Sequence, residues 1–196
     1  MFVKRVLDLI TSACGLLFLS PLFFVIALLV KLDSNGPVFF RQKRVARGGK
    51  LFAILKFRTM RNSSTNCGLG ITMADDQRIT NLGRHLRRLK LDELPQLFNV
   101  LTGDMSLVGP RPEVPKYVAL YPPDLKTIVL SVRPGITDEA SLEFRDESAL
   151  LLSTEDPEKK YIIEILPRKL QLAAGYVAHR SLVGDLRILI RTVLRR

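Results

Sequence analysis

Hydrophobic positions are densest near the N-terminus, where residues 9–30 include no charged side chain. At a rise of about 1.5 Å per residue, a helix over this run could cross a hydrocarbon core of roughly 30 Å. Ser20 and Pro21 lie in the middle of the run, and the proline frees the backbone carbonyl of Leu17. The Ser20 hydroxyl can help to satisfy that carbonyl. The pattern predicts a membrane helix over residues 1–32, broken at Ser20-Pro21.

Basic residues flank the apolar run on both sides and bear on its topology. Lys4 and Arg5 precede it, and Lys31 follows it at the start of a basic segment. Because positive flanks favour the cytoplasm, a simple span would leave one cluster on the wrong side. We therefore favour a re-entrant helix over an ordinary kinked spanning helix. A cleaved signal peptide is a further alternative, although no small-residue cleavage site closes the run before Lys31.

Beyond the apolar run, short apolar stretches alternate with turn residues. Residues 35–37 and 48–49 predict turns, and residues 38–40 and 51–57 are typical of strands. The pattern indicates a small β-hairpin. The polar stretch 61–72 has no periodicity and predicts a loop.

Two amphipathic helices are predicted in the centre of the chain. The first runs through residues 78–90 with Asp75 or Asp76 as its N-cap. The second begins near Asp92, where the two helices meet, and ends at Gly103. The prolines of the following SLVGPRPEVP stretch exclude a regular helix there.

The C-terminal segment, residues 150–196, has a helical and amphipathic pattern. Toward its end, an apolar helix face lies opposite a face that carries arginines. The apolar face comprises Leu182, Leu186, Leu189, Ile190 and Val193. Such a helix suits the headgroup layer of an anionic membrane, and a helix that packs on a protein core fits the pattern equally well.

Charge narrows the choice of partners. Thirty Lys and Arg face 19 Asp and Glu, a net charge of +11, which favours nucleic acid, phosphorylated substrates or acidic lipid. Nucleic acid is disfavoured because the arginines accompany carboxylates and a membrane segment rather than stacking aromatics. Cys14 and Cys67 provide neither a disulfide framework nor zinc-ligand spacing, which fits a reducing, cytosolic setting.

The densest cluster of polar function lies in residues 89–113. Asp92 and Glu93 stand at a predicted helix start, where free amides and the helix dipole favour negative charge. A simple helix cap is the alternative interpretation of Asp92. Basic residues surround the pair, and arginine binds phosphoryl oxygens bidentately. They are Lys56, Arg58, Arg84, Arg87, Arg88, Lys90, Arg111 and Arg133. Carboxylates beside a phosphate site also suggest Mg²⁺, which takes one or two carboxylates.

Four stretches resemble those of a known family. They are KRVLDL (4–9), GPVFFRQKRVARGGKLFAILKFRTM (36–60), DDQRITNLGRHLRRLKLDELPQLFNVLTGDMSLVGPRPE (75–113) and RPGIT (133–137). They are similar to the bacterial sugar transferase family, the monotopic phosphoglycosyl transferases. The resemblance implies an enzyme that moves a sugar-1-phosphate from a UDP-sugar to undecaprenyl phosphate, releases UMP and initiates bacterial glycan assembly. It also implies Mg²⁺ dependence and a place at the cytoplasmic face of the bacterial inner membrane.

The resemblance also assigns roles to residues. Asp92 would be the nucleophile that carries a covalent phosphosugar and would also bind the metal, and Glu93 would assist it. Phosphate binding would fall to Arg87, Arg111, Lys56 and Arg58. The family's re-entrant helix, broken at Ser-Pro, matches Ser20-Pro21.

The resemblance weakens after RPGIT. Many members continue with Gly, a small apolar pair and Gln-Val-Asn-Gly-Arg, whereas this chain reads DEASLEFRDE over residues 138–147. Arg145 keeps the register of the expected arginine, and with Arg133 it is assigned to a nucleotide-sugar loop. The identity of the sugar does not follow from the resemblance.

The sequence thus predicts a mixed α/β, mostly helical, monotopic membrane enzyme. The expected organisation is a re-entrant membrane helix over 1–32, a cytosolic catalytic region over 33–149 and interfacial amphipathic helices over 150–196, in one continuous structural unit. The expected partners are a UDP-sugar, undecaprenyl phosphate and anionic lipid, and the oligomeric state is open, with a homodimer as one alternative. The alternative function is a non-catalytic basic membrane-binding module or adaptor.

Overall fold

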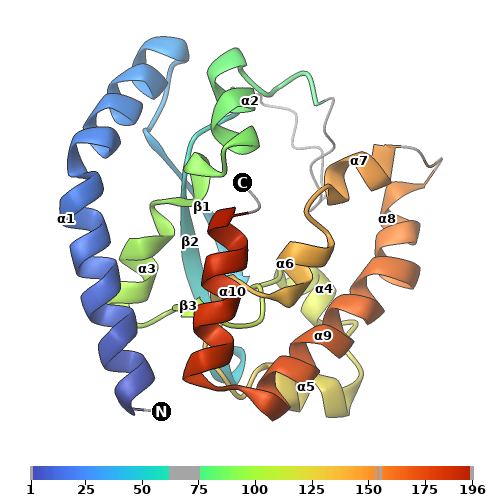
Figure 1. Cartoon of the computed structure of the whole chain (residues 1–196). Coiled ribbons are helices and arrows are strands. Elements are labelled where there is room, and N and C mark those ends of the chain that lie inside the picture. The colour runs from blue at the N-terminus through green and yellow to red at the C-terminus, as the bar shows by residue number, and fades with distance from the viewer. Residues whose placement is uncertain (1, 62–75, 153, 155, 195–196) are drawn as a thin grey trace. The chain divides into compact units, whose positions relative to one another are not determined.

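The computed structural model describes residues 2–61, 76–152, 154 and 156–194. Helices dominate, and the described strands form two small two-stranded sheets (Figure 1). The expectation of a mostly helical mixed α/β fold is confirmed. The contacts divide the described chain into two compact units, each with its own core. The first unit comprises residues 2–42, 53–61 and 76–103, and the second comprises residues 43–52, 104–152, 154 and 156–194.

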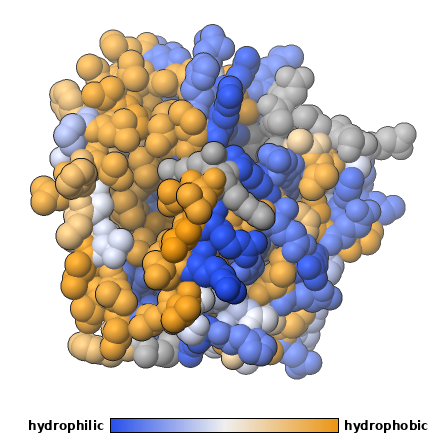
Figure 2. All heavy atoms as spheres, viewed as in Figure 1, coloured by the Kyte–Doolittle hydropathy of each residue, from blue (hydrophilic) through white to orange (hydrophobic). Residues whose placement is uncertain are grey.

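The apolar run forms one long helix, α1 (Phe2–Asp33). It is long and apolar enough to cross a membrane, and its apolar side chains lie largely on the surface (Figure 2). The sequence predicted a break at Ser20-Pro21, but the helix continues through Pro21. The Ser20 hydroxyl donates to the Leu17 carbonyl at 2.8 Å, so the acceptor that proline leaves unpaired is satisfied and the helix bows without ending (Figure 1).

The opposite side of α1 packs on the rest of the first unit. Ile26 and Val30 enter a buried cluster with Phe57 and Leu86. The Phe23 ring lies 5.3 Å from that of Phe57, centroid to centroid. The helix is therefore a structural part of the first unit.

The predicted β-hairpin is confirmed. Strand β1 (Phe39–Val45) and strand β2 (Leu51–Phe57) are joined by a short 3₁₀ turn, η1 (Arg47–Gly49). Gly48 and Gly49 have φ values of 71° and 80°, which glycine adopts without the steric cost of a side chain. The open end of the hairpin belongs to the first unit and the turn end to the second.

The central helices begin at different residues from those predicted. Helix α2 (Asn81–Arg88) is capped by Thr80, whose side chain accepts from the Gly83 amide at 2.9 Å. Asp76 is not the cap, because its carboxylate binds Arg78, and Asp75 lies outside the described residues. Residues 62–72 of the predicted loop also lie outside them.

A 3₁₀ turn, η2 (Leu91–Glu93), separates α2 from helix α3 (Gln96–Thr102). The second helix therefore starts later than predicted, after Pro95. Gly103 ends it in a left-handed conformation, with φ of 93°, as the sequence predicted.

The second unit is built around a short parallel pair of strands, β3 (Ser106–Val108) and β4 (Gly135–Thr137). Gly109 and Gly135 lie so close that a Cβ on Gly135 would be 2.1 Å from the Gly109 nitrogen. Helices surround the pair and bury a core that includes Tyr117 and Tyr161. They are α4 (Pro115–Val118), α5 (Pro123–Val129), α6 (Glu139–Glu143), α7 (Glu147–Leu152), α8 (Pro157–Lys160), a π-helical turn η3 (Tyr161–Ile165), α9 (Leu166–His179) and α10 (Leu182–Leu194).

The last helix, α10, is amphipathic as predicted. Ile188 is buried, whereas the side chains of Val183, Leu186 and Val193 are exposed and form an apolar ridge (Figure 2). Arg191 binds Glu139 at 2.9 Å on the other side. Most of the apolar face is thus not used for packing within the protein.

Candidate active site

The candidate catalytic carboxylate, Asp92, lies in η2 of the first unit. Lys90, which precedes this turn, has φ of 54° and ψ of 22°. It is the one non-glycine residue with positive φ among those described. Such a conformation costs about 1 kcal/mol or more and is found disproportionately at functional sites. The backbone is therefore held in an unfavourable state just before Asp92.

Asp92 is buried without full hydrogen bonding. Only 6% of the residue is exposed, and its Oδ1 atom has no hydrogen-bond partner. Burial raises the pKa of Asp92 above its ordinary value, and the nearby Lys56 ammonium acts in the opposite direction. Neither η2 nor α3 has a side-chain cap, so the simple helix-cap interpretation of Asp92 does not hold.

Glu93, the second member of the dyad, binds Lys56. The Lys56 Nζ atom lies 2.7 Å from Glu93 Oε1, and both side chains are largely buried. Since Glu93 raises and Lys56 lowers the pKa of Asp92, the three groups form one electrostatic cluster. The structure thus brings together two predicted carboxylates and one predicted phosphate ligand.

Asn99, which was not identified from the sequence, positions the strand that carries Lys56. Its Oδ1 atom accepts from the Leu55 amide and its Nδ2 atom donates to the Ala53 carbonyl, each at 2.9 Å. The amide side chain thus pairs with the free edge of β2 as a neighbouring strand would. No local pattern distinguishes such an asparagine, because its partners are more than 40 residues away.

Arg87 lies near the dyad at the end of α2. Its Nε atom donates to Thr59 Oγ1 at 2.9 Å. Burial lowers the pKa of Arg87 from its ordinary value, against the attraction of Asp92. Gly83 permits this arrangement, because a Cβ there would lie 2.2 Å from the Thr59 carbonyl oxygen.

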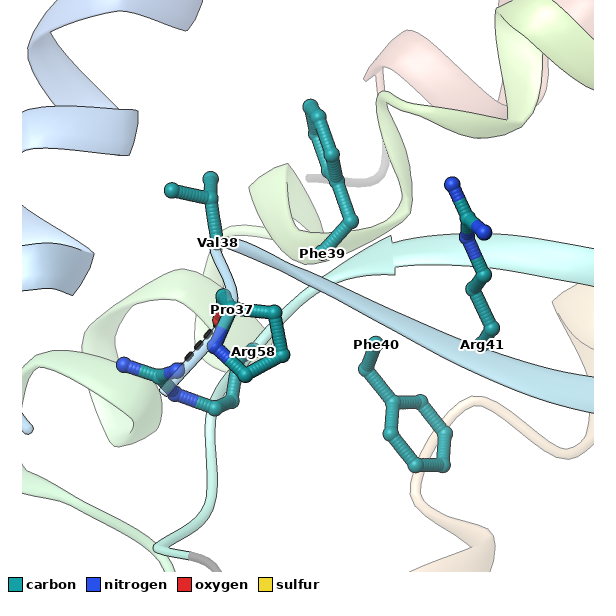
Figure 3. Close-up of a pocket in the computed structure, with 6 residues that line it drawn as sticks. All are labelled: Pro37, Val38, Phe39, Phe40, Arg41 and Arg58. Carbon is teal, nitrogen blue, oxygen red and sulfur yellow. Dashed lines mark hydrogen bonds between the residues drawn. The ribbon is translucent and has the colours of Figure 1, made fainter. Parts of the chain in front are cut away.

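Arg58, also predicted as a phosphate ligand, is used for structure. It is buried, and its terminal nitrogens donate to the carbonyls of Val30 (3.1 Å), Ser34 and Pro37. Figure 3 draws the bond to Pro37. The guanidinium therefore holds the end of α1 and the segment that follows. A role in phosphate binding stays a prediction.

The remaining residues assigned to substrate binding, Arg111, Arg133 and Arg145, belong to the second unit. The Arg111 amide donates to Asp138 Oδ2 at 3.0 Å, and its guanidinium approaches the Ile136 carbonyl at 3.4 Å. Asp138 also caps α6, because its Oδ1 atom accepts from the Ser141 amide at 2.7 Å. Arg133 is half-buried beside β4, and Arg145 is exposed after α6. Asp138 thus fixes the backbone of the Pro-Arg-Pro segment.

A largely buried polar network, not anticipated from the sequence, also supports this segment. Arg44 donates to the Pro112 carbonyl at 3.0 Å, and the Tyr161 hydroxyl donates to Glu113 Oε1 at 2.5 Å. Burial raises the pKa of Tyr161 above its ordinary value, and the charge of the Glu113 carboxylate raises it further. The hydroxyl therefore keeps its proton. The Lys169 ammonium lies 4.9 Å from the centre of the Tyr161 ring.

The donor set for a metal is small. Within the stretches of chain that the structure describes, no three His, Cys, Asp or Glu side chains gather as a metal site. The unpartnered Oδ1 atom of buried Asp92 nevertheless provides one carboxylate oxygen. That fits Mg²⁺, which commonly binds one or two carboxylates and takes its remaining ligands from phosphate and water.

The whole chain, residues 1–196, matches the family model described as bacterial sugar transferase. It is 42% identical over 143 residues to the UDP-N-acetylgalactosamine-undecaprenyl-phosphate N-acetylgalactosaminephosphotransferase of Aeromonas hydrophila. The aligned residues cover 72% of this chain and 34% of the Aeromonas protein. It is 38% identical over 201 residues to the UDP-glucose:undecaprenyl-phosphate glucose-1-phosphate transferase of Caulobacter vibrioides (97% and 68%). It is 36% identical over 209 residues to the exopolysaccharide production protein PSS of Rhizobium leguminosarum (98% and 94%). Against several other relatives the chain spans well under half of their length.

Proposed function

The chain belongs to the bacterial sugar transferase family, and from this premise we propose that it transfers a sugar-1-phosphate from a UDP-sugar to undecaprenyl phosphate. UMP is the other product, and the transfer begins the assembly of a lipid-linked glycan such as an exopolysaccharide or lipopolysaccharide. The observation that carries the proposal is the buried Asp92 carboxylate, with an unpartnered oxygen, beside the Lys56–Glu93 ion pair. The names of the relatives support the two substrates.

The reaction proceeds in two displacements. In the first, an Asp92 oxygen attacks the β-phosphorus of the UDP-sugar, the bond from that phosphorus to the bridging oxygen breaks, and UMP leaves with the electron pair. In the second, an oxygen of undecaprenyl phosphate attacks the same phosphorus and the Asp92 carboxylate leaves. Asp92 must be ionised to attack, and Lys56 favours that form. Glu93 holds Lys56 in place.

Mg²⁺ is the proposed cofactor. Asp92 would hold it together with phosphate oxygens of the substrate. When bound, Mg²⁺ neutralises pyrophosphate charge and so favours the approach of a carboxylate. Arg87, whose charge acts on Asp92, would add positive charge for the phosphates. Phosphate binding by Arg111, and contact of Arg133 and Arg145 with the nucleotide-sugar, stay predictions from the resemblance.

A monotopic topology at the cytoplasmic face of the inner membrane is supported by contacts at both ends of α1. Arg5 donates to the Val100 carbonyl at 2.7 Å, and Arg58 donates to the Val30 carbonyl at 3.1 Å. These contacts are separated by about 38 Å of helix, yet both are made within the first unit. A helix spanning roughly 30 Å of hydrocarbon would place them on opposite sides of the membrane. We therefore propose that α1, bowed at Pro21, dips into the membrane and keeps both of its ends on the cytoplasmic face.

The exposed apolar ridge of α10 provides a second membrane contact in this proposal. Its arginines, including Arg187, suit the headgroup layer of anionic lipid. Apolar side chains that are exposed in the protein would thus be buried in the bilayer surface.

Release of UMP from a panel of UDP-sugars tests the function. The protein in lipid nanodiscs, with Mg²⁺ and undecaprenyl phosphate, is expected to release UMP from at least one UDP-sugar. Asp92→Asn is expected to abolish release and the covalent phosphosugar while it retains membrane association. No release from any UDP-sugar by folded wild-type protein would refute the transferase function and favour a non-catalytic membrane module.

A further inference from the structure

An open hollow of about 470 Å³ lies where the chain leaves α1 and enters β1 (Figure 3). All of the residues that line it belong to the first unit. They are Pro37, Val38, Phe39, Phe40, Arg41 and Arg58. The lining is therefore mainly apolar, with two arginines among its residues.

The side chains that line the hollow differ in whether contacts within the protein already occupy them. The Phe39 ring stacks on Phe57, with centroids 5.5 Å apart, and Arg58 is occupied by backbone carbonyls. Phe40 points to the opposite side of β1 from Phe39 and Arg41 (Figure 3), and 47% of it is exposed. Phe40 is therefore an aromatic surface that the fold itself does not bury.

The register of the hairpin places Phe40 next to the dyad. The Arg58 amide donates to the Val38 carbonyl at 2.9 Å, and the Ala46 amide donates to the Lys50 carbonyl at 2.7 Å. In an antiparallel pair this register sets Phe40 opposite Lys56, and side chains directly opposite one another share a face of the sheet. Since Lys56 binds Glu93, the exposed ring borders the candidate active site.

The hollow also adjoins α1, because Val38 and Phe39 pack against the buried cluster that Val30 enters. Leu28, Leu29 and Leu32, in the last turns of that helix, are exposed. In the proposed topology these turns lie at the level where hydrocarbon gives way to headgroups. A ligand with an apolar chain in the bilayer and a phosphate at its surface would meet the leucines first and then Phe40, on the strand face that carries Lys56.

We propose that this hollow binds the isoprene units of the acceptor lipid that lie nearest its phosphate, with Phe40 packed against the chain. The inference rests on the proposed function and adds a site for its second substrate. The closeness of the hollow to apolar α1 favours an isoprenoid over the uracil of the donor, which an exposed aromatic ring could also accept by stacking.

The two displacements separate the two ligands experimentally. With a UDP-sugar alone, the protein is expected to release a single burst of UMP and retain the phosphosugar, and Phe40→Ala should leave the size and rate of that burst unchanged. With undecaprenyl phosphate added, Phe40→Ala should raise the KM for the acceptor about tenfold, because burial of a phenyl ring against the chain is lost. Leu51→Ala removes another exposed apolar side chain of the same hairpin and should change neither quantity.

Several outcomes would overturn the site. An unchanged acceptor KM in Phe40→Ala would do so, and a slower burst with a higher KM for the UDP-sugar would assign the hollow to the nucleotide. A short alkyl phosphate that is as good an acceptor as an isoprenyl phosphate would show that isoprene is not recognised. The absence of any burst in the wild-type protein, together with no UMP release after undecaprenyl phosphate is added, would instead refute the proposed function.

A second measurement does not depend on turnover or on the folding of the Phe40 variant. A polyprenyl phosphate with a diazirine in the isoprene next to the phosphate is added to wild-type protein and to Asp92→Asn in nanodiscs. Crosslinks to residues 37–41, reduced by excess undecaprenyl phosphate, are expected in both. Crosslinks confined to α10 or to other parts of α1 would contradict the proposal.

Discussion

Lys56 Nζ lies 2.7 Å from Glu93 Oε1, and this ion pair connects the hairpin to the turn that carries Asp92. The contact joins residues that are far apart in sequence, at a place where burial alone would keep the Asp92 carboxyl protonated. Lys56 can therefore serve catalysis without direct contact with substrate, by favouring the ionised nucleophile.

The first prediction concerns the pH dependence of turnover. Lys56→Met removes the cation that lowers the pKa of Asp92, so that pKa should rise further. Because the ionised carboxylate is the nucleophile, the acidic limb of kcat/KM for the UDP-sugar should move to higher pH. Lys50→Met, in the exposed turn of the same hairpin, is the matched control and should leave the profile in place. An unshifted acidic limb in Lys56→Met would argue against this role.

The second prediction is that Asp92→Asn is more stable than the wild-type protein at neutral pH. Burial raises the pKa of Asp92 above 3.8, so the folded state holds this proton more tightly than the unfolded state. The contribution of this proton to the stability of the folded state is complete below pH 3.8, the ordinary pKa, and is lost as pH rises through the higher pKa of folded Asp92. Asparagine keeps a neutral side chain throughout. The Tm of Asp92→Asn in detergent should therefore exceed that of the wild type by an increment that grows with pH.

The control for that measurement is Asp124→Asn, which neutralises an exposed carboxylate in the first turn of α5. It should lower the Tm slightly or leave it unchanged, because an exposed acid near a helix N-terminus stabilises by only a few tenths of a kcal/mol. A lower Tm for Asp92→Asn than for the wild type at pH 7 would mean that the carboxylate is stabilised by interactions beyond those described.

The third prediction separates a structural role of Arg58 from phosphate binding. Arg58→Met would leave the carbonyls of Val30, Ser34 and Pro37 without their donor, which should destabilise the protein by roughly 3 kcal/mol. Guanidinium chloride unfolding measures this loss. A variant with unchanged stability but a higher KM for the UDP-sugar would instead support the phosphate role predicted from the sequence.

Local patterns predicted the elements of this fold better than the contacts between them. The hairpin followed from apolar runs bounded by glycines, and Gly103 marked the end of α3, because these signals act within a few residues. The cap of α2 was predicted at Asp75 or Asp76 and lies at Thr80, because Asp76 binds Arg78 instead. Sequence proximity suggested an acidic cap, and a competing local ion pair decided otherwise.

The candidate site shows the same limit. Asp92 and Glu93 were recognised by their motif. The sequence assigned phosphate binding to both Arg58 and Lys56, whereas in the structure Arg58 donates to backbone carbonyls and Lys56 binds Glu93. The function of an arginine depends on its partners, and those partners come from distant elements. Asn99 was missed for that reason.

The fourth prediction returns to Ser20 and Pro21. Ser20→Ala should destabilise the protein by about 1 kcal/mol, because the Leu17 carbonyl loses its replacement donor in an apolar setting. In Pro21→Ala the restored backbone amide can bond that carbonyl, so the same serine change should cost little. A double-mutant cycle of thermal unfolding in nanodiscs should thus show coupling.

Pro21→Ala should also straighten α1 and make a cysteine placed at residue 2 accessible to periplasmic labelling, whereas in the wild-type protein that cysteine should remain unlabelled. Additive effects and an unchanged labelling pattern would show that the proline does not help to turn the helix back.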